Sequence, residues 1–293
     1  MHRIGIDLGG SNIVVGIVNS GKILHKKSVG TPNNINAETL IAKIVRLCNE
    51  ILDENKIELS KISSIGIGVP GSVNPYTGEL IKAPNLGIYN INISHGMKRL
   101  LGVDVYVDND ANCAALGEFE YGAAKGTTSS ITVTLGTGIG GGIILNGKIY
   151  HGAFFGAGEI GHHVIKTGGK LCNCGKKGCW EAYASATALR RIGGGKGPKR
   201  IFGDARSGDT KAIMALERYI EYLCEGLANI SNIFQPEIIV IGGGISNEGE
   251  YLLQLIDKHI KGKIFDEQIL TKFAIAELGN DAGVVGAAML GEG

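Results

Sequence analysis

The feature that most constrains the fold is a glycine-containing segment that occurs twice. Residues 4–24 read IGIDLGGSNIVVGIVNSGKIL, and residues 131–150 read ITVTLGTGIGGGIILNGKIY. The alignment pairs Leu8 with Leu135, Gly9 with Gly136 and Asn19 with Asn146. Each copy predicts a strand, a glycine turn, a second strand, a short turn and a third strand. A repeat of this length predicts two related domains that face each other, with each glycine turn directed into the cleft between them.

The remaining segments alternate between helical and strand patterns, which predicts an α/β fold. Helical periodicity covers 36–56, 111–121, 210–234, 250–260 and 282–290, and short β-rich runs lie at 65–69, 103–107, 238–241 and 273–278. We expect a small N-terminal α/β domain over 1–117, joined by a C-terminal helix at about 281–293. A larger C-terminal α/β domain should cover 118–280.

Charge and composition exclude several classes of protein. Lys and Arg number 29 against 28 Asp and Glu, so the net charge of +1 provides no overall field for nucleic acid or an acidic membrane. The longest apolar runs are far shorter than a membrane helix, and Met1–Ile6 lacks the pattern of a secretory signal. The sequence therefore predicts a cytoplasmic protein with neither nucleic-acid nor membrane partners. Its 47 glycines among 293 residues indicate close backbone approaches.

The second glycine turn, residues 136–141, fits the G-x-G-x-x-G pattern of dinucleotide sites. Such a site needs a helix after the third glycine, whereas Asn146-Gly147 between apolar runs predicts a hairpin. This disfavours a nicotinamide oxidoreductase. It favours a phosphate-binding turn whose donors are backbone N–H groups, including that of Gly138, and the Thr137 hydroxyl. The alternative is a tight hairpin whose glycines only supply positive φ angles.

The first glycine turn differs from the second by carrying an acid. Asp7 ends the first predicted strand and is followed by Gly9, Gly10, Ser11 and Asn12. A carboxylate beside a phosphate turn suits Mg²⁺ held through water, although Asp7 could instead accept hydrogen bonds from the turn itself. A third run, Gly242, Gly243 and Gly244, follows the strand-like EIIVI and is a candidate place for a nucleotide to cross the sheet end. A Walker-type phosphate loop is absent from the sequence.

Three of the six cysteines lie close together in the chain and suggest a metal site. Cys172, Cys174 and Cys179, together with His162, supply three thiolates and an imidazole, which is a complete tetrahedral zinc site. Free thiols in a loop are the alternative. Four protein ligands leave no open position, so the zinc would be structural and would fix a loop over 162–179. That loop is flanked by Glu159 and Glu181, which we interpret as candidate hydroxyl acceptors for a polyol.

A further acidic motif, VDNDAN at residues 107–112, stands where a strand runs into a helix. Asp110 could be the N-cap of that helix. Beside a phosphate and Mg²⁺ site, the same carboxylate is suited to accept a proton from an alcohol and to position it. The sequence leaves both interpretations open.

Taken together, these motifs resemble the ROK family of sugar kinases and related repressors, within the actin-like ATPase superfamily, over nearly the whole chain. The matching segments are IDLGGSN, VDNDANCAALGE, LGTGIGGG, GEIGH, CNCGKKGCWE and IGGGIS. The resemblance implies a two-domain ribonuclease H-like fold with a cleft between the domains. It assigns Asp110 as catalytic base, sugar contacts to Gly71, Asn85, Asn109, Glu159, His162 and Glu181, and zinc to His162, Cys172, Cys174 and Cys179. The phosphates and Mg²⁺ would lie near Asp7, Gly9, Gly10, Ser11, Asn12, Thr137, Gly138, Gly242, Gly243 and Gly244.

The function that this resemblance implies is ATP- and Mg²⁺-dependent phosphorylation of a hexose, in a homodimer or tetramer. The C-x-C-G-x-x-G-C-x-E form of the zinc loop is more similar to the glucokinase branch, which favours glucose and the product glucose 6-phosphate. N-acetylmannosamine kinase is the alternative, followed by fructokinase and allose kinase, and polyphosphate could replace ATP. Repressors of the family carry an N-terminal helix-turn-helix, whereas only Met1–Arg3 precede the first motif here, so we expect an enzyme.

Overall fold

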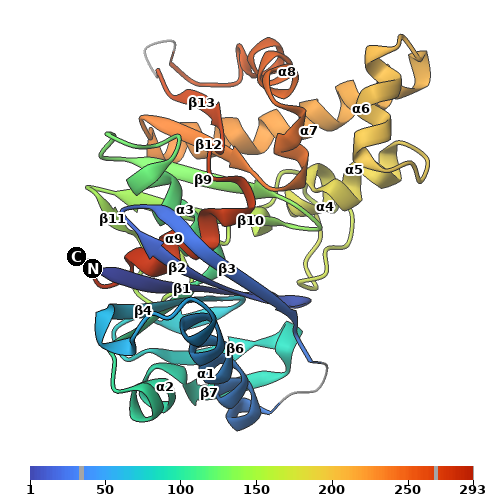
Figure 1. Cartoon of the computed structure of the whole chain (residues 1–293). Coiled ribbons are helices and arrows are strands. Elements are labelled where there is room, and N and C mark those ends of the chain that lie inside the picture. The colour runs from blue at the N-terminus through green and yellow to red at the C-terminus, as the bar shows by residue number, and fades with distance from the viewer. Residues whose placement is uncertain (33–35, 267–269, 293) are drawn as a thin grey trace. The chain divides into compact units, whose positions relative to one another are not determined.

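The computed structural model describes residues 1–32, 36–266 and 270–292 and has an α/β fold (Figure 1). The chain packs as two compact units. Unit 1 comprises residues 1–126, 142–157 and 280–293, and unit 2 comprises 127–141 and 158–279. The predicted boundary between 117 and 118 stays a prediction. Among the described helices, none combines the length and apolarity needed to cross a membrane.

The two glycine-containing repeats form the same arrangement of strands, as predicted. The first sheet has the order β3-β2-β1-β4-β8 and the second has the order β11-β10-β9-β12-β13. In each sheet the repeat supplies an edge hairpin and the first of three parallel strands. The strands of the first sheet are β1 (His2–Leu8), β2 (Asn12–Asn19), β3 (Lys22–Gly30), β4 (Ile62–Val69) and β8 (Val105–Asn109). Those of the second are β9 (Ser130–Leu135), β10 (Ile139–Leu145), β11 (Lys148–Ile149), β12 (Ile238–Gly242) and β13 (Lys272–Ile275).

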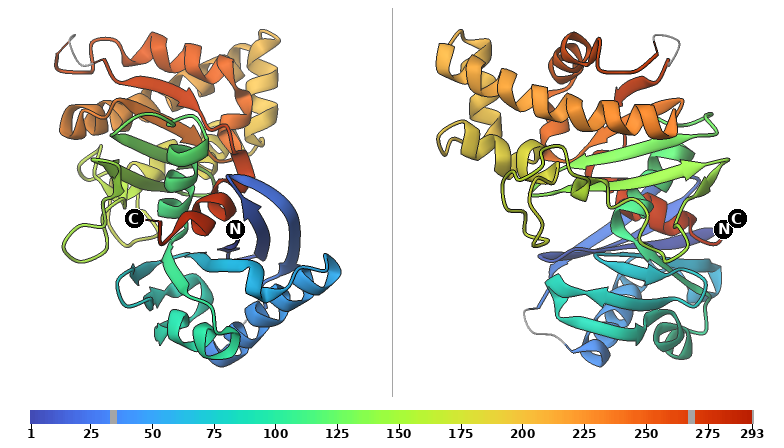
Figure 2. Two further views of the ribbon diagram at one scale, coloured as in Figure 1. Left: turned by 60° about the vertical axis from the view of Figure 1, so that its left-hand side comes forward. Right: turned by 180° about the vertical axis from the view of Figure 1, so that it is seen from behind.

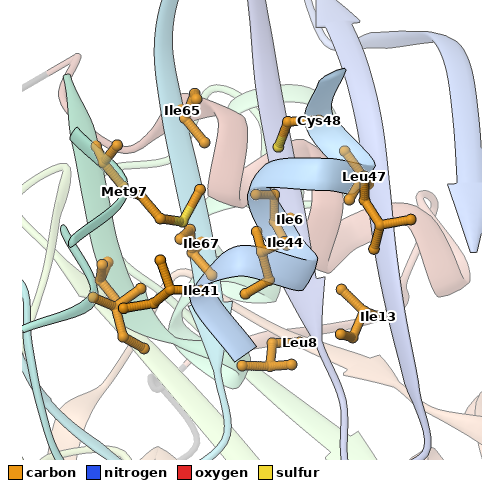
Figure 3. Close-up of a cluster of buried hydrophobic side chains, with 14 of the residues drawn as sticks. Ile6, Leu8, Ile13, Ile41, Ile44, Leu47, Cys48, Ile65, Ile67 and Met97 are labelled. Atoms are coloured by element: carbon orange, nitrogen blue, oxygen red, sulfur yellow. The ribbon is translucent and has the colours of Figure 1, made fainter. Parts of the chain in front are cut away.

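One face of the first sheet carries the main apolar core of unit 1. Ile4, Ile6 and Leu8 alternate along β1 and are fully buried, as period-two burial requires. Helix α1 (Ala37–Glu54), capped by the side chain of Asn36, packs its apolar side on this face. Figure 3 shows the cluster, with Met97 of α2 (Ile93–Leu101) beside it.

The opposite face of the first sheet holds helix α9 (Ala282–Met289), and glycine lines the contact (Figure 2). A side-chain carbon at Gly5 would overlap the carbonyl oxygen of Val284, and one at Gly66 would overlap that of Ala287. Helix α3 (Asp110–Tyr121) approaches α9 equally closely, because a side-chain carbon at Gly286 would overlap the carbonyl of Cys113. The abundance of glycine therefore has a structural cause here, since backbone packs on backbone.

Several elements lay outside the sequence prediction. Unit 1 has a three-stranded antiparallel sheet of β5 (Ser72–Asn74), β6 (Glu79–Ala83) and β7 (Ile88–Asn92), besides helix α2. Unit 2 has α4 (Glu181–Ala184), α5 (Ala186–Ile192) and α6 (Pro198–Arg206) before the two predicted helices, α7 (Thr210–Phe234) and α8 (Glu250–Ile260). Short 3₁₀ turns lie at η1 (Leu59–Lys61), η2 (Pro84–Leu86), η3 (Ile160–His162), η4 (Gly244–Glu248) and η5 (Gly279–Asp281).

The strand predicted at 103–107 is displaced towards the C-terminus, and the displacement matters for the site. Gly102 adopts a left-handed conformation that ends α2, so Val103 and Asp104 belong to the connection and not to the strand. Strand β8 therefore extends to Asn109 and delivers Asp108 and Asn109 directly to the start of α3.

Candidate active site

In unit 1, the candidate residues lie where three parallel strands end. Asp7 of β1 is in register with Gly68 of β4, and Gly68 is in register with Asp108 of β8. The carboxyl ends of parallel strands are the usual position of ligand sites in α/β sheets. Asp7, Asn109 and Asp110 are thus placed at one edge of the first sheet.

The junction between β8 and α3 decides which residue caps the helix. Asn109 is the N-cap, because its Oδ1 accepts hydrogen bonds from the backbone N–H groups of Ala111 at 2.9 Å and Asn112 at 3.2 Å. Asp110 is the first residue of the helix, half-buried, and its Oδ1 accepts from the N–H of Ala111 at 2.9 Å. The interpretation of Asp110 as the N-cap was therefore wrong, and its role as catalytic base stays a prediction.

Two of the predicted sugar contacts are in direct contact with each other. The Nδ2 atom of Asn109 donates to the carbonyl oxygen of Gly71 at 3.1 Å. Gly71 has a φ of 120°, and a side-chain carbon there would overlap the carbonyl oxygen of Lys82. An amide carries two donors, so Asn109 can offer its second N–H to a ligand. The side chain of Asn85 lies outside the described part of the structure.

The first glycine turn combines a half-buried acid with exposed backbone. Partial burial raises the pKa of Asp7, whose carboxylate also lies against the backbone of Gly283 in α9. The turn is closed by a hydrogen bond from the N–H of Gly9 to the carbonyl of Asn12 at 2.8 Å, which leaves Gly10 and Ser11 exposed. A partly desolvated carboxylate is a suitable partner for a cation such as Mg²⁺.

The predicted hairpin after the second glycine turn is confirmed. Strand β10 follows β9 after residues 136–138, and no helix opens there. Asn146 and Gly147 have φ angles of 53° and 73°, as a type I′ hairpin turn requires. The geometry of a dinucleotide-binding strand–turn–helix is therefore not formed by these residues.

The second and third glycine turns lie side by side. Gly242 at the end of β12 is in register with Thr134 of β9, and Gly243, with a φ of 80°, packs closely on the backbone of Leu135. The carbonyl of Thr137 is fixed by the Thr187 hydroxyl at 2.8 Å, while the Thr137 side chain is exposed. Together with Gly138, Gly243 and Gly244, these groups offer an exposed glycine edge of the kind that binds phosphate.

The predicted zinc ligands are brought together in unit 2. The ligand atoms of His162, Cys172, Cys174 and Cys179 all lie within 4.8 Å of one another. Cys174 Sγ is 3.6 Å from Cys179 Sγ, and Cys172 Sγ is 3.7 Å from His162 Nδ1. Ligands at about 2.0–2.3 Å from a tetrahedral zinc stand roughly 3.4–3.8 Å apart. The donor set and its spacing therefore fit zinc.

The thiols of this cluster differ in how readily they ionise. Burial, with neighbouring groups, raises the pKa of Cys172 to about 12, whereas hydrogen bonding to the backbone of Lys176 lowers that of Cys174. Three thiolates at such distances repel one another unless a metal ion offsets their charge.

The two candidate acids stand on either side of this cluster. Glu181, the first residue of α4, accepts from the N–H of Ile139 at 2.9 Å, and its other oxygen is 3.5 Å from Cys172 Sγ. Glu159 Oε2 is 3.8 Å from His162 Nε2, the ring nitrogen that does not face the thiols. The zinc loop thus holds Glu159, His162 and Glu181 near each other, and Glu181 joins it to the second glycine turn.

Sequence reasoning missed two residues of unit 1, Asp108 and His151. They form a pair in which Asp108 is buried and His151 is half-buried, with 2.7 Å between His151 Nε2 and Asp108 Oδ2. Asp108 lay within the VDNDAN motif and could have been noticed there. His151 carries no local signal, because its partner is distant in the sequence.

Comparison with known proteins gives matches over the whole chain. A model described as "ROK family" matches residues 3–293. The glucokinase of Halalkalibacterium halodurans is 36% identical, covering 98% of this chain and 94% of that protein, and the glucokinase of Thermotoga maritima is 35% identical, covering 99% and 97%. The xylose repressor of Caldicellulosiruptor bescii is 31% identical, covering 97% of this chain and 76% of the repressor.

Solved structures of ROK family proteins are also similar to this chain over nearly its whole length. A ROK family glucokinase from Streptomyces griseus, in complex with glucose and AMPPNP, has a TM-score of 0.83 and 33% identity, and the match covers 99% of both chains. The ROK hexokinase from Thermus thermophilus has a TM-score of 0.85 and 30% identity, with 99% of this chain and 97% of that chain covered.

The raised pKa of Asp7 predicts a stability change. Because its folded pKa lies above the unfolded value, its stabilising contribution is present at low pH and is lost as the pH rises through the folded pKa. At neutral pH without divalent cations, Asp7→Asn should therefore raise Tm by roughly one to several degrees. Thermal unfolding of both proteins across pH tests this. The difference should shrink in acid, where Asp7 becomes neutral, and a lower Tm for the variant at pH 7 would contradict the prediction.

The thiol cluster predicts bound zinc. Metal analysis of protein prepared without chelators should return about one zinc per chain, and Cys174→Ser should lose most of it and unfold several degrees earlier. Cys224→Ser is the matched control, because that thiol is buried in α7 and bonded to the carbonyl of Ile256. It should retain zinc. Wild-type protein without zinc, or an equal loss in both variants, would argue against the assignment.

Proposed function

We propose that this chain, which belongs to the ROK family, transfers the γ-phosphoryl group of ATP to the 6-hydroxyl of glucose. The chain is a sugar kinase, since curated glucokinases match it over nearly its full length at 35–36% identity. The observation that carries the proposal is the junction of β8 and α3. There Asn109 caps the helix and is bonded to Gly71, which leaves the Asp110 carboxylate at the carboxyl end of the sheet.

Asp110 is proposed as the proton acceptor. Phosphoryl transfer proceeds through a loose transition state, so the enzyme mainly positions the groups and stabilises charge. A carboxylate at hydrogen-bond distance from the sugar hydroxyl orients its oxygen and takes its proton as the bond to phosphorus forms. Asn109, with one amide N–H left after its bond to Gly71, would hold a neighbouring hydroxyl.

The nucleotide is proposed to bind at the glycine edge of unit 2. The N–H groups around Thr137 and Gly138, with Gly243 and Gly244 beside them, would hold the phosphates. The glucokinase structure that contains AMPPNP supports ATP as the donor. Mg²⁺, held through Asp7, would neutralise charge on the phosphates as they are transferred.

The sugar is proposed to contact the zinc loop as well. Glu159 and Glu181 would accept hydrogen bonds from hydroxyls, and the Nε2 atom of His162, which faces away from the thiols, would contact the sugar. The zinc ion has four protein ligands, so its role is to fix this loop and not to act on the reacting groups. We further propose that the protein is cytoplasmic and that it forms a homodimer or a tetramer.

The first test concerns Asp110. Because Asn109 provides the cap, Asp110→Asn should leave Tm and glucose KM nearly unchanged while kcat falls by roughly 10²-fold or more. Initial rates of ADP release with saturating ATP measure this. A wild-type kcat in the Asp110→Asn variant would show that Asp110 is not the catalytic base.

The second test concerns the sugar. The backbone of Gly71 is fixed between Lys82 and Asn109, so this loop cannot readily shift to admit a 2-acetamido group. Size differences of this kind discriminate by about 1–3 kcal/mol, so kcat/KM for glucose should exceed that for N-acetylmannosamine and fructose by roughly 10-fold or more. A coupled ADP-release assay over these sugars, mannose and N-acetylglucosamine measures it, and polyphosphate in place of ATP tests the donor. A higher kcat/KM for N-acetylmannosamine than for glucose would contradict the glucokinase assignment and favour an N-acetylmannosamine kinase.

A further inference from the structure

Next to the junction of β8 and α3 lies a carboxylate–imidazole pair, Asp108 and His151. Asp108 is 3% exposed, and the side chain of His151 is 17% exposed. The distance from His151 Nε2 to Asp108 Oδ2 is 2.7 Å. An ionised carboxylate only accepts hydrogen bonds, so in this pair His151 is the donor, through an N–H at Nε2.

The second oxygen of Asp108 fixes the start of helix α3. Its Oδ1 accepts from the backbone N–H of Asn109 at 2.7 Å and from Nδ2 of Asn112 at 2.9 Å. With the bond from His151, three donors converge on one carboxylate. Asp108 therefore fixes the main chain at the end of β8, and Asn109 and Asp110 follow directly.

His151 lies near the hairpin that follows Gly71. The ring of Tyr76 is edge-on to the His151 ring, with 6.5 Å between the ring centroids, and edge-on to Phe155, with 5.8 Å between centroids. Tyr76 lies between β5 and β6, a few residues after Gly71, whose carbonyl accepts from Asn109. This segment therefore bonds to the β8–α3 junction through Gly71, and the exposed ring of Tyr76 lies beside the imidazole that pairs with Asp108.

A purely mechanical role would not require these residue types. A buried acid and imidazole are costly to desolvate, and apolar side chains of similar volume would hold a strand end at less cost. What the pair provides is direction, because the hydrogen bonds fix where the main chain of Asn109 lies. Hydrogen-bond partners of metal ligands typically change affinity or activity by about 10- to 100-fold when they are mutated, and we expect an effect of that size for a partner of the residues at this junction.

We propose that His151 is a positioning residue for phosphoryl transfer, acting through Asp108 to orient Asn109 and Asp110. The inference rests on the proposed function of those two residues. In this inference His151 neither contacts the substrate nor exchanges a proton with it.

The test is a short series at position 151, with glucose and ATP as substrates. Both His151→Leu and His151→Asn remove the hydrogen bond to Asp108. Leucine has no N–H donor, and the side chain of asparagine is too short to bring its N–H to Asp108. Each variant should lower kcat by roughly 10-fold or more. His151→Gln can still place an N–H near Asp108 and should recover most of the loss. His259→Leu is the matched control, because it also removes a half-buried imidazole bonded to a backbone carbonyl, but in α8. It should keep wild-type kcat.

A second measurement separates positioning from stability. In an Asp110→Asn background, adding His151→Asn should lower kcat little further, since the base that His151 positions is already absent. Wild-type kcat in both donor-less variants, or a full additional loss in the double variant, would overturn the inference. Should His151→Leu not fold, His151→Asn and His151→Gln decide the outcome. Absence of sugar phosphorylation in the wild-type protein would instead refute the proposed function.

Discussion

The structure depends on the close approach of α9 to the first sheet and to α3. Glycine is required at the contact, since a single side-chain carbon at Gly66 or Gly286 would overlap a backbone carbonyl of the facing element. The sheet, α9 and α3 are therefore held at separations that no other residue permits. The position of Asp110 at the start of α3, and that of Asp7 against Gly283 of α9, both follow from this packing.

The chemistry is divided between groups of different character. In unit 1 the proposed site atoms are carboxylates and an amide, held at the carboxyl ends of β1 and β8. In unit 2 they are backbone N–H groups beside a thiol cluster, and the carboxylate of Glu181 joins these two by accepting from Ile139 next to Cys172. The proposal thus takes the base and the Mg²⁺ ligand from unit 1, and the neutral donors for phosphate from unit 2.

Much of the fold could be predicted from sequence, because the repeat and the helical periodicities are local signals. The zinc ligands were predictable for the same reason, since three of them lie within a few residues. The features that the sequence did not predict were either short elements or contacts between residues far apart in the chain. The β5–β7 sheet consists of brief strands without strong alternation, and the pairing of His151 with Asp108 depends on tertiary contacts alone. The cap at Asn109 was not foreseen, and Asp110 was the candidate considered for it, because Asn and Asp cap equally well and only geometry distinguishes them.

The order of the elements in the chain has a consequence for biosynthesis. Strands β1 and β4 are made early, but α9, which covers their glycine face, follows the whole of unit 2 in the sequence. A ribosome therefore releases the sheet of unit 1 long before the helix that completes it, and until then Gly5 and Gly66 present uncovered backbone. Domains are usually completed in the order in which they are synthesised. Here the unit begun first is finished last, so its final packing step takes place after unit 2 has been translated.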